Sequence, residues 1–209
     1  MILQIFARSL QLPKLIKNLL LSTIIFASGI NNNAIAKDMN LTVIDNRNNN
    51  NLTSNLGTKW QLVTDAIMGG LSQGQLSLDE YKGKNCLRMR GNVTTDNNGG
   101  FVQIVLPLSK NNTFNASDYS GVELEVAGND EIYNIHFRTN ELWFPWQSYR
   151  YSFKAESAWK KYRIPFKELD KYKTFNEFAQ DKIKRIGLVA IGREFQADLC
   201  LADIRFYND

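Results

Sequence analysis

Apolar and polar residues alternate in short runs along most of the chain after residue 60. Residues 122–126 read Val-Glu-Leu-Glu-Val, a pattern that buries one face of a β-strand and exposes the other. Similar runs follow, separated by turns rich in Gly, Pro, Asn and Asp. They predict strands at 86–93, 101–106, 122–126, 132–139, 148–153, 159–164, 183–191 and 198–207.

Helix is expected to be minor. Only residues 166–180 suggest a helix, and their apolar positions are irregularly spaced. Because strands do not alternate with helices, the pattern predicts an all-β, antiparallel β-sandwich. Such a fold usually carries its function on the loops at one end.

The N-terminal segment has a different character. Its basic residues, which include Arg8, precede an apolar run at 19–30, and Ala34-Ile35-Ala36 places small residues where a signal peptidase cleaves. The run is shorter than the ~20 residues that span a bilayer as a helix. We therefore expect a signal peptide at 1–36 and a mature, soluble protein outside the cytoplasm, periplasmic or secreted. A mitochondrial presequence is the alternative, because the segment lacks acids and carries Arg8.

Two regions are expected after the leader. Residues 37–57 are polar and Asn-rich, which predicts a flexible lead-in with one short strand at 41–44. Residues 58–209 form the predicted β-sandwich domain.

Charge and composition exclude several classes of protein. The chain carries 25 Lys plus Arg against 21 Asp plus Glu. Three of the 25 lie in the leader, so the mature protein keeps 22 against 21, a net charge of +1. A near-neutral body argues against a nucleic-acid partner, and only indirect contact with membranes is expected. One His and two Cys cannot supply a four-ligand zinc site or a four-cysteine iron–sulfur cluster, so we expect no metal and no cofactor.

The two cysteines, Cys86 and Cys200, have two interpretations. Export to an oxidising compartment would permit a disulfide between them. Two separate buried thiols are the alternative.

A catalytic motif occurs at residues 70–74, which read Gly-Leu-Ser-Gln-Gly and match the G-x-S-x-G elbow of α/β-hydrolases. The elbow requires a helix after the serine, whereas residues 75–81 favour strand and turn. The single histidine, His136, lies within a predicted strand, where it cannot serve a catalytic triad with Ser72. The sequence therefore predicts a protein that is not an enzyme.

Aromatic residues gather between 143 and 151. Trp143, Phe144 and Trp146 surround Pro145, which breaks the strand and favours a loop whose side chains cannot all be buried. Exposed aromatic rings stack on sugars or anchor a protein partner, so we predict a recognition surface here that includes Tyr149.

Two glycine-bearing segments carry a family resemblance. Residues 60–72 read WQLVTDAIMGGLS, and residues 91–93 and 97–101 read GNV and NNGGF. These segments resemble the family named for the complex I intermediate-associated protein of 30 kDa, whose hallmark is a Trp, then Asp-x-Val-Met-Gly-Gly-x-Ser, then Gly-x-Val or Gly-x-Leu and Asn-Asn-Gly-Gly-Phe. Ile67 replaces the usual Val. The resemblance covers residues 60–207.

The resemblance implies a galactose-binding-like jelly-roll β-sandwich, in agreement with the strand pattern. Members of the family act as assembly chaperones for respiratory complex I or for photosystems, and the domain alone is not an established enzyme. We therefore expect a non-catalytic assembly factor that binds a protein partner. Because a secretory leader places this copy outside the mitochondrial matrix, an extracytoplasmic carbohydrate-binding module is the alternative.

The glycine segments also indicate candidate residues. Tight turns are expected at Gly69, Gly70, Gly99 and Gly100, with Asp65 and Asn98 accepting from exposed amides. The candidate binding residues are Asp65, Met68, Ser72, Asn98, Phe101, Trp143, Trp146 and Tyr149.

Overall fold

The structure, a computed structural model, describes residues 42–208, without the side chain of Asn98. Twelve strands occur there: β1 (Thr42–Asp45), β2 (Gln61–Thr64), β3 (Gln73–Tyr81), β4 (Lys84–Val93), β5 (Phe101–Pro107), β6 (Gly121–Gly128), β7 (Glu131–Thr139), β8 (Ser148–Ala155), β9 (Lys160–Pro165), β10 (Asp170–Tyr172), β11 (Ile183–Ile191) and β12 (Phe195–Tyr207). The helical segments in this part are short 3₁₀ turns: η1 (Asp65–Met68), η2 (Asp96–Asn98), η3 (Phe166–Glu168) and η4 (Gln180–Lys182).

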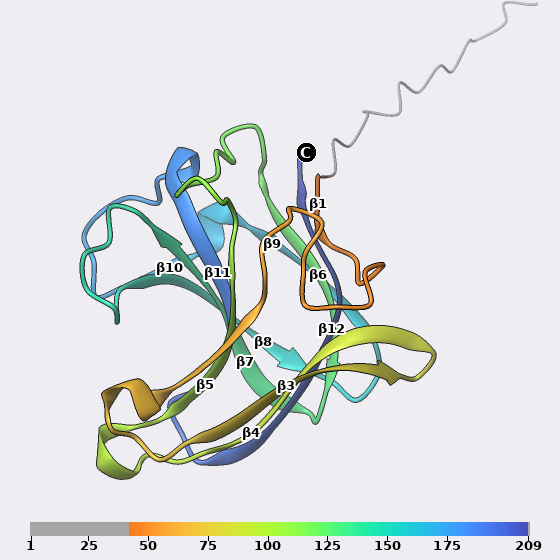
Figure 1. Cartoon of the computed structure of the whole chain (residues 1–209). Coiled ribbons are helices and arrows are strands. Elements are labelled where there is room, and N and C mark those ends of the chain that lie inside the picture. Colours follow the sequence, from red (N-terminus) through yellow and green to blue (C-terminus); the bar gives the residue numbers. More distant parts are fainter. Residues whose placement is uncertain (1–41, 209) are drawn as a thin grey trace, which may run out of the picture. The chain divides into compact units, whose positions relative to one another are not determined.

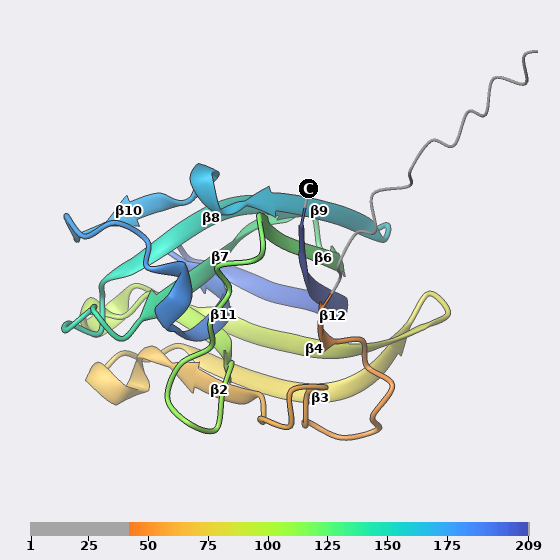
Figure 2. The same cartoon turned by 90° about the horizontal axis from the view of Figure 1, so that it is seen from above.

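The strands form two antiparallel sheets (Figure 1). The first sheet has the order β3-β4-β12-β6-β9, and β1 pairs with β12. The second sheet has the order β10-β8-β7-β11-β5-β2. Where the sheets come together at one edge, β2 of the second lies beside β3 of the first (Figure 2). The predicted all-β jelly-roll sandwich is confirmed.

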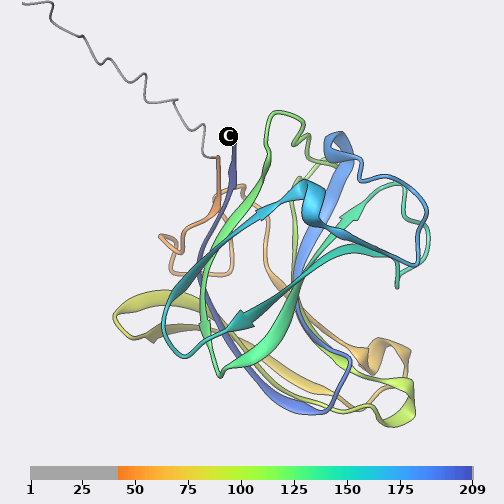
Figure 3. The same ribbon diagram turned by 180° about the vertical axis from the view of Figure 1, so that it is seen from behind.

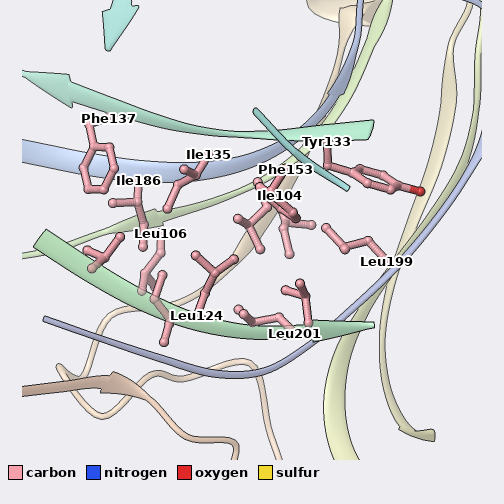
Figure 4. Close-up of a cluster of buried hydrophobic side chains, with 14 of the residues drawn as sticks. Ile104, Leu106, Leu124, Tyr133, Ile135, Phe137, Phe153, Ile186, Leu199 and Leu201 are labelled. Carbon is pink, nitrogen blue, oxygen red and sulfur yellow. The ribbon is translucent and has the colours of Figure 1, made fainter. Parts of the chain in front are cut away.

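The core lies between the two sheets. The alternation seen in the sequence explains it, because every second residue of a strand points to the same face. In β6, Val122, Leu124 and Val126 are fully buried. Figure 4 shows side chains of both sheets facing one another, with Leu124, Leu199 and Leu201 on one side and Ile104, Ile135 and Ile186 on the other.

A disulfide joins Cys86 of β4 to Cys200 of β12. The Cα atoms are 5.4 Å apart, and the two strands are neighbours in the first sheet. The structure thereby decides between the two interpretations of the cysteines.

The expected helix at 166–180 is wrong. Within it the chain forms η3, the edge strand β10 and a loop. Phe166 is buried in the core, and β10 pairs with β8, which adds a sixth strand to the second sheet. Pairing at the sheet edge and packing of Phe166 in the core stabilise this segment. A helix with irregularly spaced apolar residues would have no continuous apolar face to bury.

The short strand expected at 41–44 is present as β1, but the rest of the described lead-in is not a flexible segment apart from the domain. β1 pairs with β12, and the two strands run side by side in front and rear views (Figure 3). The indole Nε1 of Trp60 donates to the buried carboxylate of Asp45 over 2.6 Å, and Arg47 forms an ion pair with the same carboxylate at 3.1 Å. Residues 42–57 are therefore part of the domain.

The predicted signal peptide at 1–36 lies outside the described residues. Within residues 42–208, no helix is long and apolar enough to cross a membrane.

Candidate functional site

The carboxylate of Asp65 connects the two glycine segments. It accepts hydrogen bonds from the backbone N–H and the hydroxyl of Ser72, at 3.0 and 2.5 Å, and from the N–H groups of Gly100 and Phe101, at 2.5 and 3.1 Å. Burial of the carboxyl acts to raise its pKa, but the four hydrogen bonds outweigh burial and hold the pKa of Asp65 below its usual value. Asp65 therefore fixes the turns of both segments against one another.

The glycines allow this close approach. A Cβ atom on Gly70 would lie 2.4 Å from Cγ of Asp65, and one on Gly99 would lie 2.6 Å from its Oδ2. Gly69 and Gly100 have φ angles of 87° and 128°, in the region that favours glycine. All four glycines lie in turns, as the sequence predicted, and the backbone conformation or the close packing at each position favours glycine.

Three candidate binding residues are not accessible to a partner. Asp65 is fully buried, Ser72 is 4% exposed, and Tyr149 is fully buried in the core. The Tyr149 hydroxyl donates to the backbone carbonyl of Glu177 over 2.9 Å. Tyr149 lies on an inward position of β8, so its place on the candidate surface is corrected.

Other candidates come together at one groove of about 560 Å³ on the outer face of the second sheet. Residues of β5, β7, β8 and β11 form its floor. One end is formed by η1, and the other by the β7–β8 loop, which carries Trp146, and by β10. Met68, Phe101 and Trp146 line it, whereas Trp143 lies in the same loop outside the lining. The side chains that form its floor and ends also include those of Val63, Ile67, Gln103, Val105, His136, Arg138, Arg150, Tyr172, Lys173, Arg185, Val189 and Ile191, and Gly187 lies among them.

The floor has a cationic half and an apolar half. Along β11, the residues that line the groove are Arg185, Gly187, Val189 and Ile191, at the period of two expected for one face of a strand. Arg185 pairs in register with Arg138 of β7, and at the other end Ile191 pairs with Phe101 of β5. The polarity of the groove therefore changes along its length.

The cationic half is crowded with basic side chains. His136 pairs in register with Arg150 of β8 and, on its other side, with Gly187 of β11, where a Cβ atom would lie 3.3 Å from Oε1 of Gln103. The Arg150 guanidinium stacks on the ring of Tyr172, 3.4 Å from its centroid, and its Nε donates to the hydroxyl of Ser148.

The loop between β7 and β8 is organised by Arg138. Its guanidinium donates to the backbone carbonyls of Leu142, Phe144, Pro145 and Gln147, at distances of 2.6 to 3.2 Å. A single charged side chain thereby holds the loop that carries the tryptophans.

The aromatic side chains of this loop face solvent, as the sequence predicted. Trp143 is 89% exposed, and the rings of Phe144 and Trp146 stack at 4.9 Å with half of each exposed. At the opposite end of the groove, Ile67 and Met68 of η1 are also largely exposed. The groove thus lies between two exposed apolar ends.

Burial shapes the electrostatics of the floor. It lowers the pKa of Arg138, Arg150 and Arg185. Burial, with the nearby charges of Arg150 and Arg138, lowers the pKa of His136 to about 3, so this imidazole is neutral at physiological pH. Its Nε2 atom is buried and has no hydrogen-bond partner among the described residues.

Sequence reasoning missed the floor of the groove. Arg150, Arg185, His136 and Tyr172 were not candidates, although polar residues at every second position of 134–138 and 148–152 mark an outer sheet face. Strand pairing decides which strands share this outer face, and the sequence alone did not show how the strands pair. Within residues 42–208, no group of three or more His, Cys, Asp or Glu side chains could hold a metal ion.

Comparison with known families matches residues 50–201 to Complex I intermediate-associated protein 30 (CIA30). The chain belongs to the CIA30 family. A comparison with curated protein sequences finds no match.

Solved structures share the fold of this CIA30 protein. The family 11 carbohydrate-binding module of the cellulase Lic26A-Cel5E of Clostridium thermocellum has a TM-score of 0.64 and 14% identity, covering 81% of this chain and 95% of that one. The same family's module in complex with a β-1,3-1,4-mixed-linked tetrasaccharide gives 0.62 and 14%, covering 80% and 95%. A family 30 carbohydrate-binding module gives 0.52 and 19%, covering 67% and 92%. These likenesses show that the chain shares the β-sandwich fold of these modules, which is consistent with a galactose-binding-like sandwich.

Proposed function

We propose that this CIA30 protein is a non-catalytic binding protein that holds a segment of another protein in the groove of the second sheet, as an assembly or scaffolding factor. The observation that carries the proposal is the placement of two exposed apolar groups, around Met68 and around Trp146, at the two ends of one groove. Exposed apolar patches with polar surroundings are typical of protein–protein contact sites.

The composition of the two ends supports a protein partner. Tryptophan is enriched among the residues that carry binding energy at interfaces, and methionine adapts to irregular apolar surfaces. Membership of a family named for an assembly intermediate is consistent with this role.

The proposal that the protein has no catalytic activity is supported by the surroundings of Ser72. Its hydroxyl donates to the Asp65 carboxylate and is buried. His136 lies on β7, in the second sheet, with its side chain in the groove. No Ser–His pair of the kind that activates a nucleophile is present among the described side chains.

Carbohydrate binding is the second candidate function. It is favoured by the rings of Trp146 and Tyr172, which line the groove and are of the kind that stack on sugars. Each ring already has one partner, because Trp146 stacks on Phe144 and Tyr172 on Arg150. Since both rings already have partners and the floor also holds arginines, we rank this function second.

We further propose that the protein works outside the cytoplasm after removal of the leader. The disulfide between Cys86 and Cys200 supports an oxidising compartment, whereas the mitochondrial matrix of the alternative keeps thiols reduced.

Site-specific photo-crosslinking tests the proposed function. A benzophenone amino acid replaces Trp146 in the groove, and as a matched control it replaces Leu78, an exposed apolar residue of β3 in the first sheet. Both full-length proteins are irradiated in the cells that make them. We expect a discrete adduct from position 146 that protease digests and glycosidases leave intact, and no adduct from position 78.

Two results would contradict the proposal. Equal labelling from both positions would show that the groove is not the binding surface. An adduct at position 146 that glycosidases remove would replace the protein partner with a carbohydrate.

A further inference from the structure

The cationic half of the groove lacks a counter-charge. Arg138, Arg150, Arg185 and Lys173 line the groove, and its lining includes no Asp or Glu. Arg185 is half-buried, and its guanidinium forms no hydrogen bond or ion pair with a side chain or backbone group of the described residues. Four positive charges thus share one hollow without an acid among them.

The acids near this half do not neutralise it. Glu141 forms an ion pair with Lys182 at 2.8 Å, and Glu177 pairs with Lys171. Asp170 is opposite Arg150 in the pairing of β10 with β8, but the two side chains form no ion pair, and Asp170 does not line the groove.

This arrangement of positive charges lowers the stability of the fold. Like charges at directly opposite positions of neighbouring strands destabilise a sheet, and Arg138 and Arg185 are such a pair. Partial burial of the guanidinium groups adds a desolvation cost. The buried Nε2 of His136 lacks a partner in the same hollow. An anionic group in the groove would offset the repulsion between the arginines and their desolvation cost at once.

The apolar half of the groove favours apolar groups of an occupant. Val189, Ile191 and Phe101 line it, and Met68 closes its end. An occupant of the whole groove therefore needs acidic groups at one end and apolar groups at the other. Peptide side chains supply such a segregated pattern, whereas repeating sugar units present the same polar groups throughout.

The length of the groove sets the size of the occupant. From Arg185 to Ile191 along β11, seven residues rise about 20 Å at ~3.4 Å per residue. An extended segment of about six residues spans that distance.

We propose, on the basis of the proposed function, that the groove binds an extended acidic segment of a partner protein. Its carboxylates lie against Arg150 and Arg185, and its apolar side chains lie on Val189, Ile191 and Met68. Arg138 contributes charge while its guanidinium holds the β7–β8 loop.

Selection from a library of random dodecapeptides displayed on phage tests this inference. The full-length protein is the bait, and the Arg150→Gln/Arg185→Gln double variant removes peptides that bind elsewhere. We expect enriched peptides with acidic residues clustered to one side of apolar ones. In fluorescence anisotropy, replacing the Asp and Glu of one such peptide by Asn and Gln weakens binding about tenfold or more.

Matched variants place the effect in the groove. Arg185→Gln weakens binding of the acidic peptide about fivefold or more, because a charge-assisted contact is lost. Arg185→Lys keeps the charge and retains most of the affinity. The control Arg90→Gln removes a half-exposed arginine of the first sheet and changes affinity less than about twofold. Circular dichroism confirms that each variant folds.

Each other outcome overturns the inference in a distinguishable way. Equal binding of the acidic and neutral peptides, lost in Trp146→Ala, leaves the protein-binding function intact and removes the acidic requirement. Failure to enrich any peptide overturns the inference, and saturable binding of oligogalacturonate lost in Arg185→Gln would then also overturn the proposed protein-binding function.

Discussion

The backbone N–H of Phe101 donates to the carboxylate of Asp65 over 3.1 Å, although 36 residues separate them. Through this contact, the turn after η1 and the turn before β5 form one unit. The unit places Met68 and Phe101 at the same end of the groove. The glycine segments of this family member thus build one end of the groove from buried hydrogen bonds.

Replacing Asp65 by Asn should destabilise the domain by about 3 kcal/mol, because an amide cannot accept all four hydrogen bonds and leaves buried donors unpaired. Chemical denaturation at pH 7 measures this loss. Asp96→Asn is the control, since Asp96 is exposed on η2 and its replacement should cost less than about 0.5 kcal/mol. Equal stability of the two variants would show that Asp65 does not hold the turns.

The depressed pKa of His136 predicts a pH dependence of stability. The folded value is about 3, below the ~6.5 of an unfolded histidine, so the unfolded chain binds a proton that the folded chain excludes. Stability from this group is present above pH ~6.5 and falls as the pH is lowered toward 3. We expect wild-type protein to lose stability relative to His136→Gln across that range in parallel urea denaturations. A difference that stays constant between pH 7 and pH 5 would refute the shift.

The tryptophans of the β7–β8 loop should matter for binding and not for folding. Trp143→Ala/Trp146→Ala is expected to weaken binding of the groove's partner about tenfold or more. The midpoint of denaturation should change little, because both rings are exposed. Trp60→Ala is the contrasting variant: its ring is 2% exposed in the core, and its loss should cost about 3 to 5 kcal/mol. A large stability loss in the loop variant with undiminished binding would contradict the recognition role.

Arg138 should keep the β7–β8 loop ordered. Arg138→Gln removes donors to four backbone carbonyls, so amide hydrogen exchange in residues 141–147 should accelerate about tenfold or more. Arg193→Gln is the control, since this half-exposed arginine pairs with Glu131 and makes no bond to the loop. Unchanged exchange in Arg138→Gln would mean that the loop is held by other contacts.

The disulfide between Cys86 and Cys200 should stabilise the folded domain. It closes a long loop, with 114 residues of sequence separation, so its reduction is expected to cost about 3 to 5 kcal/mol. Denaturation with and without a phosphine reductant measures the difference, and Cys86→Ser/Cys200→Ser should not respond to the reductant. Free thiols in protein isolated from its native compartment would contradict both the pairing and the proposed location.

Most of the fold could be predicted from the sequence because apolar and polar residues alternate within each strand, and this local pattern identifies the side chains of the core. In β6, the buried Val122 and Val126 are two of the positions that the pattern assigned to the inner face. The prediction of flexibility was wrong for the described part of the lead-in because tertiary contacts order this segment. The indole of Trp60 and the guanidinium of Arg47 both bind Asp45. Composition alone cannot show such contacts.

The candidate site was predictable only at its ends. Trp146 follows a proline in a dense aromatic cluster, and Met68 lies in a recognisable glycine segment, so local features indicated both. Arg138 and Arg185 lie in separate strands, and they meet because β7 pairs with β11 in one register. That register depends on the packed core, so the cationic floor became visible only with the structure.

Chemical-shift mapping tests the central claim, that the groove of the second sheet is the binding surface, most directly. The isotope-labelled full-length protein is titrated with a selected acidic dodecapeptide, and backbone amide and arginine Nε–Hε signals are followed. We predict the largest shifts at Gln103, Arg185 and Gly187 of the groove, with Arg88 and Arg90 of the first sheet unaffected. Shifts concentrated on β3, β4 and β12, with the groove signals unmoved, would contradict it.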